Sequence, residues 1–325
     1  MRAEWLRRIT PDCDWHWIDT DLPMMRSARA WQSIAFRYKG GFAVRRINEF
    51  VLSHLASRAF DLIWVDKAVF LRPETMAALR QSTRKLVHFT PDTAFGVNAS
   101  RNFERAIPLF DLLVTTKSFE ATEYTKHTDP TKLKLVSQGF DPLVHYPRSN
   151  DSARRKEAVF VGLAEPDRER CISELLKKEI TVRVAGRGWS GFIRKWVDHP
   201  NLIFEGEDAF GDAYADLLSN AWIGLGLLSK RFTELHTTRT FEIPACGAVL
   251  ATEQTAETSK FFLPGEAVFF RDYAHLAARV GELFSLGDNN SLAQIAQAGR
   301  SRVVSDRRDY ESLLTDIIRD PRIAV

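Results

Sequence analysis

The sequence has few cysteines and no long apolar run. Only three of its 325 residues are cysteine, an odd number at widely separated positions. This pattern argues against a disulfide framework or a zinc site and favours a reducing compartment. No stretch reaches the roughly 18 apolar residues that a membrane-spanning helix needs, and the first residues lack the pattern of a signal peptide. We therefore expect a cytoplasmic protein, for which the composition leaves peripheral membrane contact open without indicating it.

Strong net charge and common catalytic motifs are also missing. The formal net charge of +3 is too small to indicate nucleic acid as the main partner. The phosphate-loop pattern Gly-x-x-x-x-Gly-Lys-Ser/Thr is absent, which argues against an ATPase. No nucleophile elbow or cluster of metal ligands occurs, so we expect no metal centre and no resident cofactor. The hydrophobic share of 45% and the length suit a soluble globular protein with two domains.

Short apolar segments alternate with segments of helical period along the whole chain. This alternation predicts βαβ units and parallel sheets. Helical periods are clearest at 44–60, 276–286, 291–303 and 310–318. Eleven strands are predicted, too many for one comfortable sheet, so we expect two sheets. The predicted strands are 15–19, 61–65, 86–89, 112–115, 133–136, 158–161, 182–185, 202–204, 223–228, 249–252 and 268–270.

A linker is predicted near the middle of the chain. Residues 140–152 contain two prolines followed by a polar cluster without apolar period. The prediction is a Rossmann-like domain at 1–146 and a second one at 147–308. A doubly wound domain normally opens with an apolar strand and a glycine turn. This chain opens with the pattern of an amphipathic helix, so we expect either a truncated start that lacks the first strand or an unusual strand order.

Two glutamates, Glu234 and Glu242, precede one of the apolar strands. Seven residues separate them, and the second lies at the head of a short helix that we expect to begin near Thr238. With Glu234 in the preceding loop, both acids face a cleft at the carboxyl ends of parallel strands, where open α/β sheets bind ligands. Carboxylates in that position suit the vicinal hydroxyls of a ribose or a hexose.

A glycine and two arginines suggest an anion site. Gly162 ends an apolar strand before a loop that runs into a helix, and unpaired backbone amides there favour anions. Arg168 or Arg170 could complete a pyrophosphate clamp by paired hydrogen bonds. The alternative is that Gly162 only makes the turn and that both arginines are solvated.

Further candidates leave two interpretations open. Gly186 follows the next strand and permits close approach of the backbone, while Trp189 either lines the cleft or packs in the core. Arg239, between Thr238 and Thr240 at the predicted helix start, either contacts a diphosphate or pairs with one of the two glutamates.

Two histidines are candidates as well. His88 and Asp92 end an apolar strand in the first half, where a general base or an acceptor-positioning group would lie. A buried structural role is the alternative for His88. His236 either contacts a sugar hydroxyl or caps the helix near Thr238.

Several segments resemble the CgeB-like glycosyltransferases (spore maturation protein and YkvP-like), which have the GT-B fold. The spacing of Glu234 and Glu242 also resembles the two-glutamate motif of retaining GT-B enzymes. The resemblance spans nearly the whole chain in the family's order. It rests on residues 61–67, 88–92, 111–117, 138–147, 160–162, 186–189, 238–247 and 261–267.

The resemblance implies a role for each candidate residue. Glu242 would hold the ribose of a nucleotide, and Glu234 would face the donor sugar. Gly162 and Arg168 would lie beside the diphosphate. Such enzymes need no metal, because basic residues and backbone amides stabilise the departing diphosphate. Gly186 and Trp189 would line the nucleotide side. With the candidates from the residues themselves, the predicted donor site also includes His236, Thr238, Arg239 and Thr240.

We therefore expect an α/β protein of GT-B type, with two Rossmann-like domains whose parallel sheets face a central cleft. Its expected function is metal-independent transfer of a sugar from a nucleotide-diphosphate sugar to a glycan, protein or small-molecule acceptor, in surface-glycan, coat or protein glycosylation. The second domain would bind the donor. In GT-B proteins the last helix often returns to the first domain, an expectation that extends here to 309–319. The alternatives are a non-catalytic nucleotide- or sugar-binding protein on a decayed GT-B scaffold, and an epimerase of the same architecture.

Overall fold

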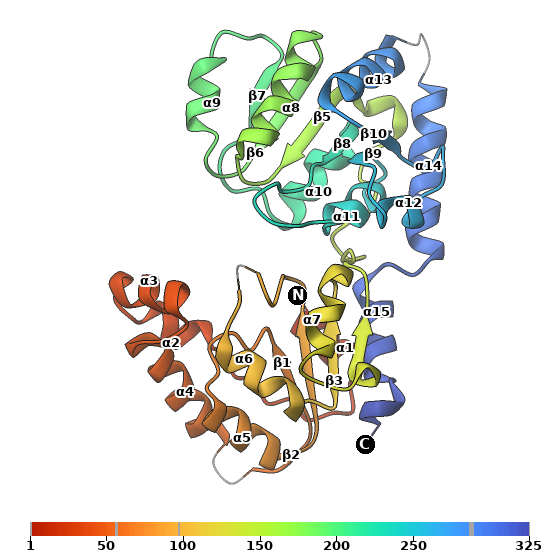
Figure 1. The fold of residues 1–325 in the computed structure, drawn as a ribbon. Coiled ribbons are helices and arrows are strands. Elements are labelled where there is room, and N and C mark those ends of the chain that lie inside the picture. Colours follow the sequence, from red (N-terminus) through yellow and green to blue (C-terminus); the bar gives the residue numbers. More distant parts are fainter. Residues whose placement is uncertain (1, 56–57, 97, 286–288, 325) are drawn as a thin grey trace. The chain divides into compact units, whose positions relative to one another are not determined.

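The computed structural model describes residues 2–55, 58–96, 98–285 and 289–324. These residues form two compact units (Figure 1). The first unit contains Arg2–Ser137 and the residues from Leu314 onward, and the second contains Gln138–Leu313. The division falls at 137/138, before the predicted one at 146/147, and the residues from Leu314 onward group with the first unit. All three cysteines are free, and no described helix is long and apolar enough to cross a membrane.

The first unit is built on a four-stranded parallel sheet in the order β1-β2-β3-β4. Apolar side chains of its helices cover the sheet and form one core. Its strands are β1 (Phe60–Asp66), β2 (Thr83–Thr90), β3 (Leu112–Thr115) and β4 (Leu133–Leu135). Its helices are α1 (Arg2–Ile9), α2 (Asp21–Met25), α3 (Arg29–Tyr38), α4 (Phe42–Leu55), α5 (Pro73–Gln81), α6 (Arg101–Ala106), α7 (Ala121–Thr125) and most of α15 (Tyr310–Ile318).

Four of the five strands predicted in this half are confirmed, and the one at 15–19 is wrong. Those residues have no regular structure. Trp17, at the centre of the apolar pattern, is 57% exposed. An apolar run becomes a strand only where a neighbouring strand pairs with its backbone, and none does so here. The helix predicted at the start of the chain is present as α1, which buries Trp5 and Leu6.

The second unit is built on a six-stranded parallel sheet in the order β10-β9-β8-β5-β6-β7. All six strands predicted here are confirmed. The strands are β5 (Arg155–Val161), β6 (Thr181–Ala185), β7 (Leu202–Phe204), β8 (Ala221–Gly226), β9 (Val249–Glu253) and β10 (Val268–Phe270). The helices are α8 (Pro166–Lys177), α9 (Ser190–Lys195), α10 (Gly211–Ser219), α11 (Arg239–Ala245), α12 (Thr258–Phe261), α13 (Tyr273–Ser285) and α14 (Asn290–Ser305).

The strand order of this sheet reverses between β5 and β8. The chain first adds β6 and β7 on one side of β5 and then adds β8, β9 and β10 on the other. Crossovers on opposite sides leave a gap between the loops at the carboxyl ends of β5 and β8, and ligands of open α/β sheets bind at this position. The topology therefore marks the carboxyl ends of β5 and β8 as the candidate site of the second unit.

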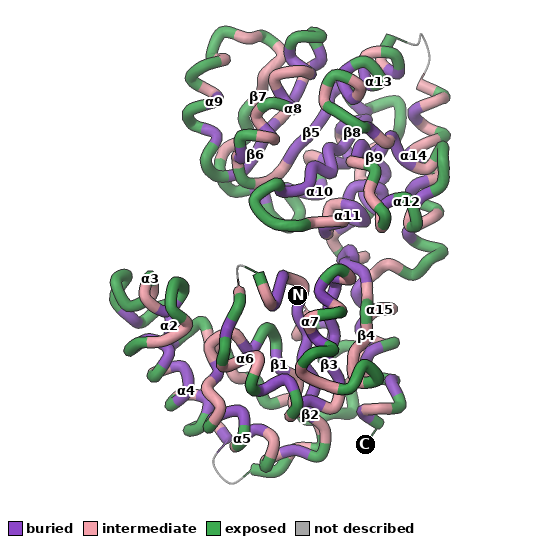
Figure 2. Tube along the Cα trace, in the orientation of Figure 1, coloured by how far each residue is buried: buried purple, intermediate pink, exposed green. Residues whose placement is uncertain are grey.

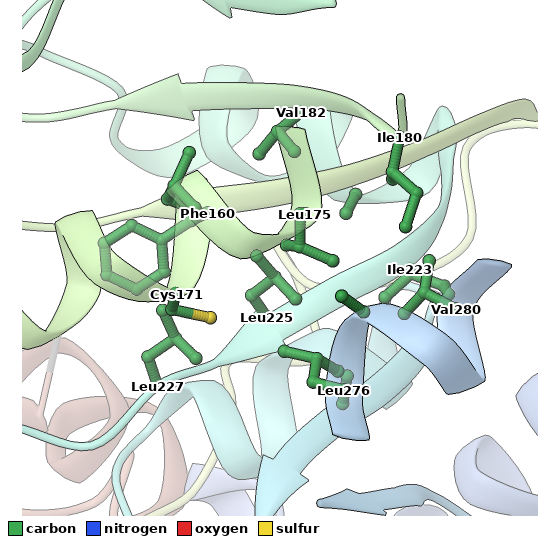
Figure 3. Packing of buried hydrophobic residues seen from close by; sticks show 14 of the residues in the cluster. Phe160, Cys171, Leu175, Ile180, Val182, Ile223, Leu225, Leu227, Leu276 and Val280 are labelled. Carbon is green, nitrogen blue, oxygen red and sulfur yellow. The ribbon is translucent and has the colours of Figure 1, made fainter. Parts of the chain in front are cut away.

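Two apolar cores, one on each face of the sheet, support these strand ends. Alternate residues of the central strands face opposite sides of the sheet. Phe160 of β5 belongs to one apolar cluster with Leu175 of α8 and Leu276 of α13, on one side of the sheet (Figure 3). Val159 packs with α10 and α11 on the other side. Each large buried side chain of this kind contributes about 1.5–3 kcal/mol, so the strand ends are rigidly supported.

The predicted linker at 140–152 is packed against the second unit. Phe140 is buried, and its N–H donates to the Arg308 carbonyl at 3.1 Å. Arg148 forms an ion pair of 2.5 Å with Asp212 of α10. The prolines and polar residues predicted a free connection, but the buried ring and the ion pair fix the segment.

Candidate functional site

The site is built on the turns that follow β5 and β6. Gly162 comes directly after β5, and its N–H donates to the Ala185 carbonyl at 2.9 Å. Gly186 follows β6 with φ of +125°, a conformation that strongly favours glycine. A Cβ at this position would overlap the carbonyl group of Gly162. The close approach predicted for Gly186 is present, and the neighbouring backbone that it approaches is the turn at Gly162.

Trp189 belongs to the core, and the prediction that its ring lines a nucleotide site is wrong. The side chain has no exposed surface. Its indole N–H donates to the Gly162 carbonyl at 2.9 Å, and its ring packs edge-on against Phe160 and Phe192. Trp189 thus supports the Gly162 turn from the core. This is the core role that the sequence had left open as an alternative.

Arg168 is the arginine of α8 that faces the site. It is buried, and its guanidinium pairs with Glu165 at 2.8 Å and donates to the Leu163 carbonyl at 3.1 Å. Ser229, in the loop after β8, donates to the same Glu165 at 2.9 Å and so connects the two strand ends. Burial, with the neighbouring cation of Arg239, lowers the pKa of Arg168.

Arg170 faces away from the site. It pairs with Asp167 and lines a groove between α8, α9 and α13, together with Trp196 and Tyr273. Apart from Arg170 itself, none of the residues predicted for donor binding or catalysis lines that groove. The alternative between Arg168 and Arg170 is therefore decided by the direction in which the first turn of α8 presents each side chain.

Arg239 is the first residue of α11 and stands beside the same turn. Its guanidinium donates to the Leu227 carbonyl at 3.2 Å and lies 5.5 Å from the centre of the Phe160 ring. Its Nη1 is 3.4 Å from the point that a Cβ on Gly162 would occupy. Within the described residues it forms no ion pair, and its buried Nε has no hydrogen-bond partner. The alternative of pairing with one of the two glutamates is not observed, so the cation is available to an anion.

Glu242 presents a buried carboxylate in the first turn of α11. Tyr214 of α10 donates to its Oε2 at 2.8 Å. Its Oε1 lies 4.0 Å from Nε2 of His145 and accepts no hydrogen bond from the described residues. Nδ1 of His145 accepts the N–H of Asp141 at 3.0 Å, which leaves the proton on Nε2, toward Glu242. Burial lowers the pKa of His145 and raises that of Tyr214, so both groups are neutral near pH 7.

Sequence reasoning missed Tyr214, Ser229 and Glu165, and it quoted His145 only as part of a motif. Tyr214 lies in a helix of ordinary amphipathic pattern, where a buried tyrosine gives no signal of its own. Glu165 and Ser229 come from segments 64 residues apart in the sequence. Only the pairing of β5 with β8 brings these two side chains together.

The loop before α11 holds Glu234 where the sequence placed it. Its Oε2 accepts the N–H of Ser229 at 2.7 Å, and the side chain is partly exposed. Thr238 precedes the helix without a side-chain cap, whereas the buried Thr240 accepts the N–H of Thr237 at 3.1 Å. Among the residues that the structure describes, no group of three or more His, Cys, Asp or Glu side chains is arranged to hold a metal ion.

His236 has neither of the two roles that the sequence left open. It is buried, and its Nε2 accepts the N–H of Gln138 at 2.9 Å. Its Nδ1 contacts the carboxylate of Glu257, and the rings of Phe241 and Phe261 pack against it. His236 therefore anchors the start of the second unit and neither caps α11 nor reaches solvent.

In the first unit, His88 is buried and Asp92 is accessible. His88 lies within β2 with the rings of Phe103 and Phe110 at 4.6 and 5.3 Å, and it has no exposed surface. This position argues against contact with a substrate. Asp92 lies in the turn after β2 and forms a 2.5 Å ion pair with Lys67. Asp92 therefore stays a candidate for a general base or an acceptor-positioning group. His88 has the buried structural role that the sequence had left open.

The buried imidazole of His88 is expected to make the stability of the first unit depend on pH. Burial lowers its pKa from 6.5 to about 4. Below pH 6.5 the unfolded chain binds a proton that the folded chain does not, so this contribution, up to about 3 kcal/mol, is lost as the pH falls toward 4. Urea unfolding of the full chain at pH 7.5 and 4.5 should therefore show a smaller pH effect in His88→Leu. An equal effect in both proteins would contradict the assignment.

Known proteins share this architecture. Residues 167–319, somewhat under half of the chain, match a family model described as glycosyl transferase-like. The crystal structure of HepE from Anabaena in complex with UDP matches with a TM-score of 0.61 and 15% identity, over 85% of this chain and 80% of that one. The structure of sucrose-phosphate synthase from Thermosynechococcus elongatus matches with a TM-score of 0.62 and 14% identity, over 88% and 78%. The chain has the GT-B fold.

The GT-B fold confirms the predicted α/β class and the two parallel sheets. A second HepE structure, in complex with UDP-glucose, matches with a TM-score of 0.59 and 15% identity over 85% of this chain and 80% of that one. None of the curated protein sequences matches the chain. The CgeB-like subfamily stays a prediction.

Proposed function

We propose that this GT-B chain is a glycosyltransferase that binds a nucleotide-diphosphate sugar on its second unit. The observation that carries the proposal is the pair formed by Arg239 and Glu242 at the start of α11. Among the described residues the guanidinium of Arg239 has no ionic partner and Oε1 of Glu242 accepts no hydrogen bond, and the two lie one helical turn apart beside the strand reversal of the sheet. The glycosyl transferase-like match over this region and the UDP complexes of HepE support the proposal.

The donor's polar groups correspond to the groups of the site. Arg239, with the buried cation of Arg168 behind it, would bind the diphosphate and stabilise the charge that grows on it as the sugar leaves. Oε1 of Glu242 would accept a ribose hydroxyl while Tyr214 holds Oε2. Glu234, partly exposed in the loop before α11, would face the sugar.

Transfer forms a bond between an acceptor hydroxyl oxygen and the anomeric carbon and breaks the bond from that carbon to the diphosphate. The acceptor's proton must leave to a base. Asp92 is the candidate for that role on the first unit, because it is partly exposed in the turn after β2 whereas His88 is buried. We extend the proposal to a CgeB-like enzyme that transfers a hexose without a metal ion.

Replacing Glu242 by glutamine tests the ribose contact. The amide keeps an oxygen that accepts from Tyr214, so the fold should survive, but the negative charge is lost. Because a hydrogen bond to a charged group contributes about 1.5–3 kcal/mol, we expect affinity for the preferred nucleoside diphosphate to fall roughly 10-fold or more. Titration calorimetry with uridine, guanosine and thymidine diphosphates measures this affinity.

Glu174→Gln is the matched control for this variant, since Glu174 lies on α8 and pairs with Lys177 at 2.6 Å away from the site. It should bind each diphosphate like the unchanged chain. Equal affinities of Glu242→Gln and the control for all three diphosphates would remove Glu242 from the donor site. Diphosphate binding without any hydrolysis or transfer of the matching sugar nucleotides would favour the non-catalytic binding protein instead.

A further inference from the structure

Helices α2, α3 and the start of α4 carry a group of exposed basic and apolar side chains on the first unit. Between Asp21 and Glu49 the sequence contains six lysines and arginines and no aspartate or glutamate. The same stretch supplies several of the most exposed large apolar side chains of the chain. We call this surface the basic-aromatic face; it consists of Met25, Arg26, Arg29, Trp31, Phe36, Arg37, Tyr38, Phe42 and Arg45.

Helix α3 is largely exposed, although the ring of Trp31 lies against Phe42 and that of Phe36 against Phe70. A surface helix normally buries an apolar stripe against the protein, but only Ala35 of the ten residues of α3 is buried. Figure 2 shows α3 mostly in the colour of exposed residues. Phe36 is 58% and Tyr38 is 68% exposed, and Met25 at the end of α2 is 74% exposed. Leaving these side chains in water costs hydrophobic free energy that a partner surface would recover.

The positive charge of the face is only partly compensated. Arg45 pairs with Glu49 at 3.5 Å. In the part of the chain that the structure describes, Arg26, Arg29 and Arg37 form no ion pair. The guanidinium of Arg37 lies 5.6 Å from the ring of Tyr38 instead. Arg37 therefore stands beside an exposed aromatic ring rather than beside a carboxylate, and Arg45 lies near both the Phe42 ring and Glu49.

We propose that the basic-aromatic face docks the chain onto an anionic membrane surface. Aromatic and apolar side chains enter the boundary between headgroups and acyl chains, while arginines bind the lipid phosphates. A second copy of the chain is a poor fit, because the uncompensated charges would face each other. A nucleic acid would leave Met25, which is 74% exposed, without an apolar partner. This inference does not depend on the proposed enzymatic activity.

Vesicle co-sedimentation of the full chain tests the docking. Vesicles of equal parts phosphatidylglycerol and phosphatidylcholine should bind it, and vesicles of phosphatidylcholine alone should bind it much more weakly. Each basic residue near an anionic leaflet contributes about fivefold to binding. The triple variant Arg26→Gln, Arg29→Gln, Arg37→Gln should therefore bind on the order of 100-fold more weakly. Its matched control removes the same charge elsewhere on the first unit, at Arg84, Arg105 and Lys126.

A second variant tests the apolar contribution. The double variant Met25→Ser, Tyr38→Ser changes two highly exposed side chains, so its circular dichroism spectrum should match that of the unchanged chain. Its binding to vesicles should fall roughly 10-fold. The control Phe119→Ser with Leu135→Ser changes exposed apolar residues of the same unit outside the face. Equal losses in the variants and their controls would overturn the proposal. So would concentration-dependent dimerisation that Met25→Ser with Tyr38→Ser abolishes, or binding to heparin as tight as to vesicles and insensitive to that variant.

Discussion

Arg239→Gln is expected to weaken nucleoside diphosphate binding by on the order of 100-fold and to reduce sugar transfer by at least as much. Arg239 is the cation of the site without an ionic partner among the described residues, and its guanidinium stands beside the Gly162 turn. Loss of two charged hydrogen bonds to a phosphate corresponds to about 3 kcal/mol. The change should appear in kcat as well as in affinity, because the diphosphate gains negative charge as the sugar leaves.

Two further variants sharpen this test. Arg239→Lys keeps the charge but loses the planar fork, so binding should recover to within about 10-fold of the unchanged chain. Arg170→Gln removes a guanidinium of α8 at a position that lines the groove between α8, α9 and α13, and it should leave diphosphate affinity unchanged. Titration calorimetry measures all three. If Arg239→Gln and Arg170→Gln bind equally well, the diphosphate does not lie at α11.

Gly186→Ala is expected to destabilise the chain by about 3–5 kcal/mol, the largest stability effect that we predict. Two penalties add at this position. The backbone φ of +125° is strained for any residue with a Cβ, and the added methyl group would overlap the backbone carbonyl of Gly162. Neither turn can move freely, because Trp189 holds the Gly162 carbonyl from the core. Urea unfolding followed by circular dichroism measures the loss.

Gly191→Ala is the matched control for this variant. Gly191 lies in α9, five residues further along, and a Cβ there would meet no atom within 4 Å. Alanine at a helical position should be neutral or stabilise by up to about 1 kcal/mol. An unfolding midpoint of Gly186→Ala equal to that of Gly191→Ala would show that the two turns are not packed backbone to backbone.

The success of the strand predictions has a simple origin. A strand buried on both faces of a parallel sheet must be apolar along its length, and Ala221–Gly226 is buried at every residue. The failure at 15–19 has the converse origin, because an apolar run such as that around Trp17 contains no information about whether a partner strand lies beside it. The packing of the predicted linker was missed for the same reason, since Pro142 and Pro147 describe the local backbone and not the buried contacts of Phe140.

The sequence alone determined the alternation of strands and helices, the positions of the glycine turns, and the presence of Glu234 and Glu242 before and within one short helix. These features depend on local pattern and on residues near one another in the chain. The tertiary structure decided which side chains face the site. It buried Trp189, His88 and His236, and it left Arg239 without an ionic partner in the part of the chain that the structure describes. Exposure is set by what packs against a residue, and the strand order that brings β5 beside β8 is fixed by the packing of the whole unit.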